Sequence, residues 1–276
     1  MTNRRGFPTF TLCADDFALS PAISETIAEL ASRGCINAVS CMAALPGWDE
    51  DVRLLSGIGT GSGRAPVQVG LHLVLAGERP LTRMKVQRPD GRLPGADRTM
   101  MLAYGGQLDL DEMTREIEAQ FAAFVRARGH APDFVDAHQH VHVHPGIRER
   151  VIAATQRLAP HAWMRNPADR MIAMLRRPFA DKAIGSTLHA AGLGKAYRRH
   201  GIAANDSFAG HYNYRDDFAR LLPRFFRAPG RRHLIMCHPG SGHLPGDGIA
   251  EARIREAAVI RRMSLASRLA ELRVAL

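Results

Sequence analysis

Aspartate and histidine residues stand at the ends of short apolar runs in this 276-residue chain. The residues concerned are Asp15, Asp16, His72, His138 and His238. A carboxylate together with two neutral imidazoles can bind a divalent metal and leave positions open for water and substrate. A neighbouring carboxylate that does not bind the metal can act as a general base. These residue types therefore predict a metal-dependent hydrolytic centre.

The elements that must position these residues are the apolar runs, which are rich in β-forming residues. Strands are expected at residues 10–14, 38–43, 67–71, 134–137, 162–164 and 234–237. Helical patterns lie between them, at residues 21–33, 111–128, 145–158 and 249–274. Strands alternating with helices predict a parallel α/β fold. We expect one domain over residues 1–276, because no linker-like segment interrupts the chain.

The carboxyl ends of the strands are where the polar residues are expected to meet. In a parallel α/β barrel these ends converge at one mouth, where such enzymes keep their active sites. Arg165 follows a predicted strand in the same way. Neighbours in an extended strand point to opposite sides, but the backbone turns at a strand end, so Asp15 and Asp16 can both face the mouth.

Each candidate also has a structural interpretation when it is considered alone. A pair of aspartates is common in turns and at helix starts, and His72 by itself fits a hydrogen-bonded core histidine. His238 lies at a strand-to-turn corner, where it is either a catalytic acid or a turn residue. The segment 138–144 holds four of the 13 histidines at alternate positions, on one face if it is extended. A low-complexity histidine tract is the alternative for that segment.

Charge and composition limit the classes of protein. Lys and Arg number 37 against 27 Asp and Glu, a formal net charge of +10. Almost all of the cations are scattered arginines, which we attribute to genome composition, with attraction to an anionic membrane surface or nucleic acid as the alternative. The 46% hydrophobic and 23% charged residues are typical of globular proteins and exclude disordered, collagen-like and coiled-coil classes.

The cysteine pattern and the hydropathy predict the cellular compartment of the protein. Four cysteines without CxxC spacing, in apolar contexts, predict buried reduced thiols in a cytoplasmic protein. No window approaches the ~18 apolar residues of a membrane span. The first residues lack the cleavage site of a signal peptide.

Several other segments carry expectations of their own. Residues 76–110 are rich in Gly, Pro and Arg without periodicity, and a loop of this length is often a lid or binding loop. The glycine-rich segment 59–63 precedes a strand, so it is expected to be a surface turn and not a phosphate loop. Residues 168–206 are expected to be mostly helix and loop. The final helix carries six arginines on or near its solvent side.

Four ordered motifs resemble one known family over residues 10–265. They are Ala14-Asp15-Asp16-Phe17, Gly70-Leu71-His72-Leu73, Asp136-Ala137-His138-Gln139-His140-Val141-His142 and Cys237-His238-Pro239-Gly240. Weaker matches are Glu116–Phe121 and Arg165 followed by Pro167. The sequence resembles the YdjC/ChbG family of carbohydrate deacetylases, including its hopanoid-biosynthesis HpnK branch. Ala18 departs from the family pattern, which often has glycine at this position.

The resemblance implies a distorted (β/α) barrel of mostly parallel strands. It also implies a divalent metal, Mg²⁺ or Zn²⁺, and removal of the N-acetyl group from an amino sugar. Carried over by position, the metal ligands would be Asp16, His72 and His138. The general base would be Asp15, and the general acid that protonates the leaving amine would be His238.

Three further residues have supporting roles under the same resemblance. His140 and His142 would orient the metal ligands or contact substrate. Arg165, or a backbone N–H, would help to stabilise the oxyanion.

The substrate and the reaction class have alternatives at this point. A metal-dependent phosphoesterase or esterase would use the same ligands, although two-metal phosphatases usually gather more carboxylates. A basic nucleic-acid-binding protein is the third hypothesis, but the aromatic residues expected on its basic surface are not seen, so no nucleic acid partner is expected. The substrate is expected to be a chitooligosaccharide-type or lipid-linked glycan. Association with a membrane surface through the basic charge and a homodimer remain compatible with the sequence.

Overall fold

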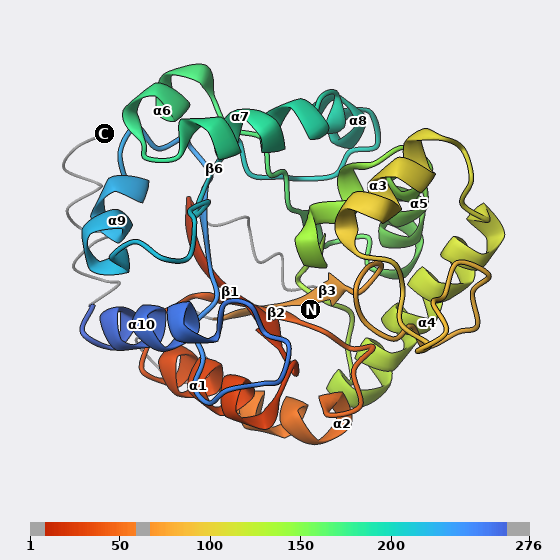
Figure 1. Ribbon diagram of the computed structural model, residues 1–276, viewed down its shortest axis with the longest axis horizontal. Coiled ribbons are helices and arrows are strands. Elements are labelled where there is room, and N and C mark those ends of the chain that lie inside the picture. The colour runs from red at the N-terminus through yellow and green to blue at the C-terminus, as the bar shows by residue number, and fades with distance from the viewer. Residues whose placement is uncertain (1–8, 59–66, 264–276) are drawn as a thin grey trace.

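The computed structural model describes residues 9–58 and 67–263, and its described strands form one curled parallel sheet (Figure 1). Seven strands follow the order β5-β4-β3-β2-β1-β7-β6. Their bounds are β1 Phe10–Phe17, β2 Ala38–Cys41, β3 Gln68–Leu73, β4 Phe134–Ala137, β5 Trp163–Met164, β6 Ser207–Ala209 and β7 His233–Cys237. Met164 of the edge strand β5 forms an isolated parallel bridge with Ala204, which precedes the other edge strand, β6. The expected distorted barrel of parallel strands is confirmed.

Helices connect the strands and cover the outside of the sheet. The longer ones are α1 Pro21–Ser32, α3 Ala96–Tyr104, α4 Leu110–Arg128, α5 Ile147–Leu158, α7 Ala180–His189, α9 Phe218–Phe225 and α10 Ala250–Arg261. The shorter ones are α2 Trp48–Asp51, α6 Met171–Arg176, α8 Leu193–Arg199 and the 3-10 segments η1 Val52–Leu55 and η2 His138–Val143.

Local capping explains why two helices lie where the sequence predicts them. The Ser20 hydroxyl accepts from the Ile23 N–H, and Pro21 stands at the first position of α1. Asp109 accepts from the first backbone amides of α4, and Gly129 ends this helix in the left-handed region, at φ 80°. Both helices are therefore set by local sequence and confirm the predictions.

Two elements near the C-terminal half were missed by the sequence reasoning. The strand β6 has only three residues, which is too short to show an alternating pattern. The helix α9 contains Pro223 and was not predicted either. The segment 76–110 was also predicted as a loop throughout, whereas its later part forms α3.

The long connection 76–95 is fixed to the body of the protein by two buried side chains of α4. The Glu116 carboxylate accepts from the backbone amides of Leu81 and Thr82 at 2.9 and 2.7 Å. Gln120 bonds both the N–H and the C=O of Val74, each at 2.8 Å. The Glu116–Phe121 motif therefore holds this connection beside the carboxyl end of β3.

The end of the chain differs from the predicted long helix. The described helix α10 ends at Arg261, and residues 264–276 lie outside the described part. Its Arg253 is buried, which contradicts the expectation that the arginines of this helix face solvent. The predicted turn at 59–63 also lies outside the described residues.

The expectation of buried, reduced cysteines agrees with the structure. All four cysteines are buried and free. Among the described helices, none has both the length and the apolar character needed to cross a bilayer.

Side-chain sizes are complementary across the barrel interior. Small residues on the first strands, Cys13 and Ala38, form one buried cluster with the larger Phe134, Trp163 and Phe208 of strands on the other side. The rings of Phe134 and Trp163 stack at 4.5 Å. This layer fills the interior of the barrel below the carboxyl ends of the strands.

Gly70 is required by the same layer, and its replacement tests the packing. A Cβ atom at this position would lie 2.4 Å from three ring atoms of Phe134. We expect Gly70→Ala to lower the free energy of unfolding by about 1–3 kcal/mol, the usual cost of overpacking a core. Denaturant unfolding measures this loss. Gly95→Ala is the control, because no atom lies within 4 Å of its added Cβ, and equal losses in both variants would contradict the packing argument.

Candidate active site

A cavity of about 790 Å³ opens at the carboxyl ends of the strands. Asp15, Asp16, His72, His138 and His238 all line it. The convergence expected from the sequence is therefore present. The first three lie within the last residues of their strands, not after them as predicted, and His138 and His238 follow β4 and β7 directly.

An irregularity in β1 turns both aspartates towards the cavity. The pairing of β1 with β2 shifts register between Ala14 and Phe17. Asp16 has φ 67° and Ala18 has φ 74°, both in the left-handed region that favours glycine. The left-handed backbone at Ala18 explains physically why the family pattern often has glycine at this position. The backbone turn predicted at this strand end is a bulge.

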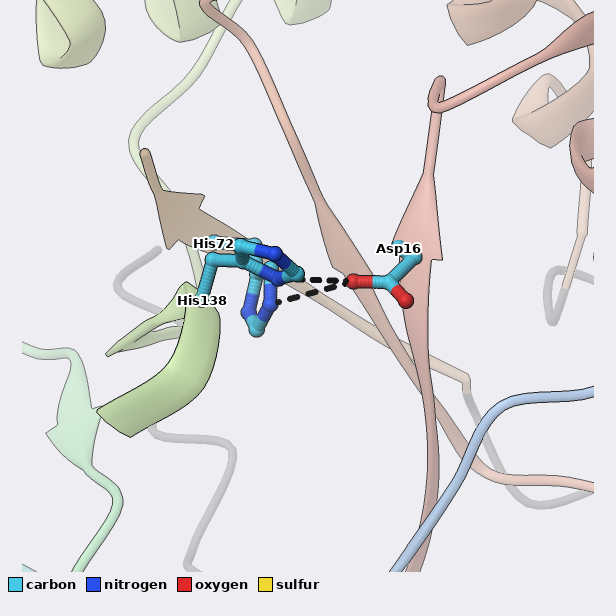
Figure 2. Close-up of side chains that lie close together, drawn as sticks. All are labelled: Asp16, His72 and His138. Carbon is cyan, nitrogen blue, oxygen red and sulfur yellow. Dashed lines mark hydrogen bonds and ion pairs between the residues drawn. The ribbon is translucent and has the colours of Figure 1, made fainter. Parts of the chain in front are cut away.

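Two histidines, one from β3 and one from η2, meet at an oxygen atom of Asp16 on β1. Figure 2 shows Asp16 on β1 pointing towards His72 of β3 and His138 at the start of η2. Asp16 Oδ1 lies 3.1 Å from His138 Nδ1 and 3.5 Å from His72 Nε2. One ligand atom from each residue lies within 4.8 Å of the others. Two imidazole nitrogens and one carboxylate oxygen at this spacing fit a small divalent cation.

Asp136 fixes the orientation of His72. Its Oδ1 accepts from His72 Nδ1 and from the Ser40 hydroxyl, both at 2.6 Å. Burial alone would lower the pKa of His72, but the Asp136 carboxylate raises it to about 10. Because Nδ1 donates to Asp136, Nε2 is the nitrogen that faces Asp16, as in histidines held by a carboxylate behind a metal.

Arg165 holds Asp15 from below the cavity. Its two terminal nitrogens donate to the two oxygens of Asp15, each at 2.6 Å, and one also pairs with Asp136 Oδ2 at 2.5 Å. Arg165 is fully buried and is absent from the cavity lining. In this structure the Arg165 guanidinium positions the carboxylates, and its contact with the oxyanion stays a prediction.

The position of Arg165 also explains how a second buried cluster of acidic groups is tolerated. Cys13, Asp15 and Asp136 have ligand atoms within 4.8 Å of one another. The Arg165 guanidinium contacts all three, with its Nη2 at 3.2 Å from Cys13 Sγ. An arginine thus already supplies the positive charge that a cation would bring there.

Arg253 is a site residue that the sequence reasoning missed. Its Nη2 donates to Asp16 Oδ2 at 2.7 Å, and its Nε donates to Asp247 at 2.8 Å. Burial by itself would raise the pKa of Asp16, but Arg253, and then His138, lower it well below its usual range. Arg253 leaves Asp16 Oδ1 free for the two histidines. No spacing in the sequence distinguishes it from the other arginines of its helix.

The histidine-rich segment does not present one face. Gln139 and His140 adopt φ 54° and 57°, which bends the chain within η2. His138 and His140 consequently line the cavity, whereas His142 is buried and donates Nε2 to the Arg165 carbonyl at 3.0 Å. His144 lies against the rings of Tyr104 and His189. The extended arrangement is therefore wrong.

His238 is held at the cavity wall by Glu256 of α10, another residue missed from sequence. The Glu256 carboxyl accepts from the His238 backbone N–H and from the Tyr212 hydroxyl. The His238 ring contacts Tyr214 at 5.6 Å between centroids. Burial lowers the pKa of His238 to about 4, so its imidazole is neutral at pH 7 before substrate binds.

Glu256 gives a testable dependence of stability on pH. Burial raises its pKa from 4.5 to about 7, so between these values the folded state binds a proton that the unfolded state has lost. Its contribution to stability is therefore full below about pH 4.5 and falls as the pH rises to 7. Between pH 4.5 and 7 the free energy of unfolding of the wild type should fall by about 3 kcal/mol relative to that of Glu256→Gln. Urea unfolding at a series of pH values measures the difference, and parallel profiles would contradict it.

Comparisons with known proteins identify the family. The model of the YdjC-like protein family matches residues 9–273. This chain belongs to the YdjC-like family. The expected YdjC family resemblance is therefore confirmed.

Relatives of this YdjC-like protein include named deacetylases. A chitooligosaccharide deacetylase of Serratia marcescens is 30% identical, with 82% of this chain and 79% of the relative covered. A carbohydrate deacetylase of Homo sapiens is 26% identical, with 85% and 76% covered. A solved structure from Enterococcus faecalis V583, titled as a cellobiose-phosphate cleavage protein, superposes with TM-score 0.72 and 18% identity over 95% of this chain and 94% of its own. This last likeness concerns the fold.

Proposed function

We propose that this protein is a metal-dependent deacetylase that hydrolyses the N-acetyl amide of an amino sugar. The observation that carries the proposal is the Asp16, His72 and His138 cluster beside a second carboxylate, Asp15, at the floor of the cavity. The family and the named relatives confirm the expectation of a hydrolase acting on amide bonds.

Asp16, His72 and His138 would hold the divalent cation, either Mg²⁺ or Zn²⁺. Two imidazoles favour Zn²⁺ by ligand softness, whereas the family resemblance favours Mg²⁺. When bound, such a cation polarises the amide carbonyl and lowers the pKa of a water molecule. Asp136 and Arg253 hold His72 and Asp16 in place for this role.

Asp15 would be the general base. It lines the cavity next to Asp16 but is not part of the Asp16, His72 and His138 cluster. The two bonds from Arg165 fix its carboxylate group and balance its negative charge. From this position Asp15 takes the proton from the attacking water as the new C–O bond forms.

His238 would be the general acid for the leaving amine. Burial keeps its imidazole neutral in the free protein, whereas the nearby Asp16 and Asp15 raise its proton affinity. The negative charge that develops on the tetrahedral carbon's oxygen acts in the same direction. The proton that Asp15 took from the water would pass to His238 and from there to the nitrogen. Asp15 then returns to its carboxylate form and His238 to its neutral form, and the C–N bond breaks in preference to the new C–O bond.

Buried nitrogens on the cavity wall support a carbohydrate substrate. Nδ1 of His140, Nε2 of His211, Nδ1 of His238 and Nη1 of Arg253 are buried and have no hydrogen-bond partner among the described residues. All four side chains line the cavity. Buried polar groups of this kind require partners, and sugar hydroxyl and amide groups provide them. We propose a chitooligosaccharide-type glycan, the substrate that the names of two relatives give, or a lipid-linked glycan.

The second acidic cluster of the described residues disfavours a phosphoesterase. Arg165 contacts all three of its members, Cys13, Asp15 and Asp136, and so takes the place of the second metal ion of many phosphoesterases. The four free, buried cysteines support a cytoplasmic location.

Acetate release from N-acetylglucosamine and its oligomers tests the activity. Metal-stripped protein should be inactive, and Mg²⁺ or Zn²⁺ should restore release. His138→Ala should abolish it because a ligand is lost. Release of phosphate from sugar phosphates, without release of acetate, would instead support the phosphoesterase.

Asp15→Asn tests the general base. An amide cannot accept the proton, so we expect kcat to fall by roughly 10²–10⁴-fold. Metal binding, followed by isothermal titration calorimetry, should remain because Asp15 is not a ligand. Full activity in this variant would contradict the assignment, and an unchanged melting temperature would exclude a folding defect.

Asp136→Asn tests the support of His72. A neutral amide holds the imidazole more weakly and places its NH₂ group near the Arg165 guanidinium, so metal affinity should fall about 10–100-fold. Calorimetric titration of stripped protein with Zn²⁺ measures this change. Asp133→Asn is the matched control, since this carboxylate bonds the Val69 amide at the far end of the same strand pair. Equal metal affinity in wild type and Asp136→Asn would refute the positioning role.

A further inference from the structure

The connection from β5 to β6 exposes an unusual number of large apolar side chains. Of the eleven that are exposed in the described residues, five lie on α6 and α7: Met171, Ile172, Leu175, Ile184 and Leu188. Leu175 is 78% and Leu188 67% exposed. We refer to these five residues as the α6–α7 patch. Concentrated exposed apolar surface of this kind usually marks an interaction site.

The two helices that carry the patch form one unit. Thr187 of α7 accepts from the Asp169 backbone amide and contacts Met174 of α6. Ala173 and Met174 are the buried residues of α6, and α7 has none. The patch residues are therefore not needed to hold this part of the core together.

Positive charge surrounds the patch. Residues 170–200 contain seven arginines and lysines but one carboxylate, Asp181. Arg176 and Lys182, beside the patch, are exposed and form no ion pair within the described residues. Part of the net positive charge of the chain is therefore concentrated around the patch. Apolar side chains with flanking cations are the combination that binds the interface of an anionic bilayer.

The patch adjoins the mouth of the cavity. The Phe179 ring, between α6 and α7, contacts Tyr212 at 6.4 Å between centroids. Burial, followed by the charge of Lys182 on α7, lowers the pKa of His211, a residue of the cavity lining. Figure 1 shows α6, α7 and α8 in a row along one edge of the molecule. A surface bound here would lie next to the entrance of the active site.

We propose that the α6–α7 patch docks this protein on an anionic lipid bilayer. The apolar side chains enter the acyl boundary, and Arg176 and Lys182 meet the lipid phosphates. A symmetric contact between two copies would bring the same cations face to face, which disfavours a dimer through this surface. The docking does not depend on the proposed reaction, although it would present a lipid-linked glycan to the cavity.

Vesicle cosedimentation tests the proposal directly. The full chain should bind vesicles of equal parts phosphatidylglycerol and phosphatidylcholine and bind pure phosphatidylcholine at least tenfold more weakly. Leu175→Asp with Leu188→Asp should weaken binding to the mixed vesicles at least tenfold. Arg176→Glu with Lys182→Glu should weaken it by roughly fivefold or more for each position.

Matched controls separate the patch from general charge and from the reaction. Leu54→Asp replaces an exposed leucine on η1, and Arg126→Glu an exposed arginine on α4, so both should bind vesicles like the wild type. Acetate release from a soluble oligosaccharide should be unchanged in the patch variants, so failure of docking and failure of the reaction are distinguishable. The proposal is overturned by absent vesicle binding, by equal losses in control and patch variants, or by a dimer in sedimentation velocity that the patch variants dissociate.

Discussion

A chain of alternating buried charges is the constraint on which the site depends. It runs from Asp15 to Arg165, Asp136 and His72, and then through Asp16 and Arg253 to Asp247. Each carboxylate is paired on both sides or held by an additional hydrogen bond. Removing one partner from a buried ion pair typically costs about 3–5 kcal/mol, because it leaves an uncompensated charge. The carboxylates proposed to act in catalysis are therefore held in place by the same interactions that make their burial tolerable.

The barrel below this chain provides the rigid support. Aromatic residues from β4, β5 and β6 fill the interior against small residues of β1 and β2, and Gly70 of β3 faces the Phe134 ring. Arg165 lies above that layer, with its guanidinium 6.0 Å from the Phe208 ring centre. The filled layer leaves no space into which the Arg165 side chain could move away from Asp15 and Asp136. The cavity lies on the other side of the arginine, at the carboxyl ends of the strands. The bulge at Asp16 then lets neighbouring residues of one strand serve two different roles.

The cavity wall is built from parts that are distant in sequence. Arg253 of α10 bonds both the floor residue Asp16 and Asp247 of the preceding loop, so this loop is tied to the centre. Glu256, one turn along the same helix, holds His238. The helix α10 therefore positions both Asp16, the proposed metal ligand, and His238, the proposed general acid. On the opposite side, the helices after β5 leave the exposed surface from which we infer bilayer docking.

The sequence by itself determined six of the seven strands of the sheet, the capped helices α1 and α4, and the residue types that meet at the mouth. These features are encoded locally: apolar runs of β-forming residues, Ser20 before Pro21, and polar residues at strand ends. The ordered motifs were also sufficient to identify the family. Tertiary structure decided which arginines are structural and how the histidine-rich segment bends. Arg253 and Glu256 look like surface residues of a helix along the chain, and the strand-end position of Arg165 does not reveal its burial, since the partners that permit the burial of these residues are contributed by distant strands and helices.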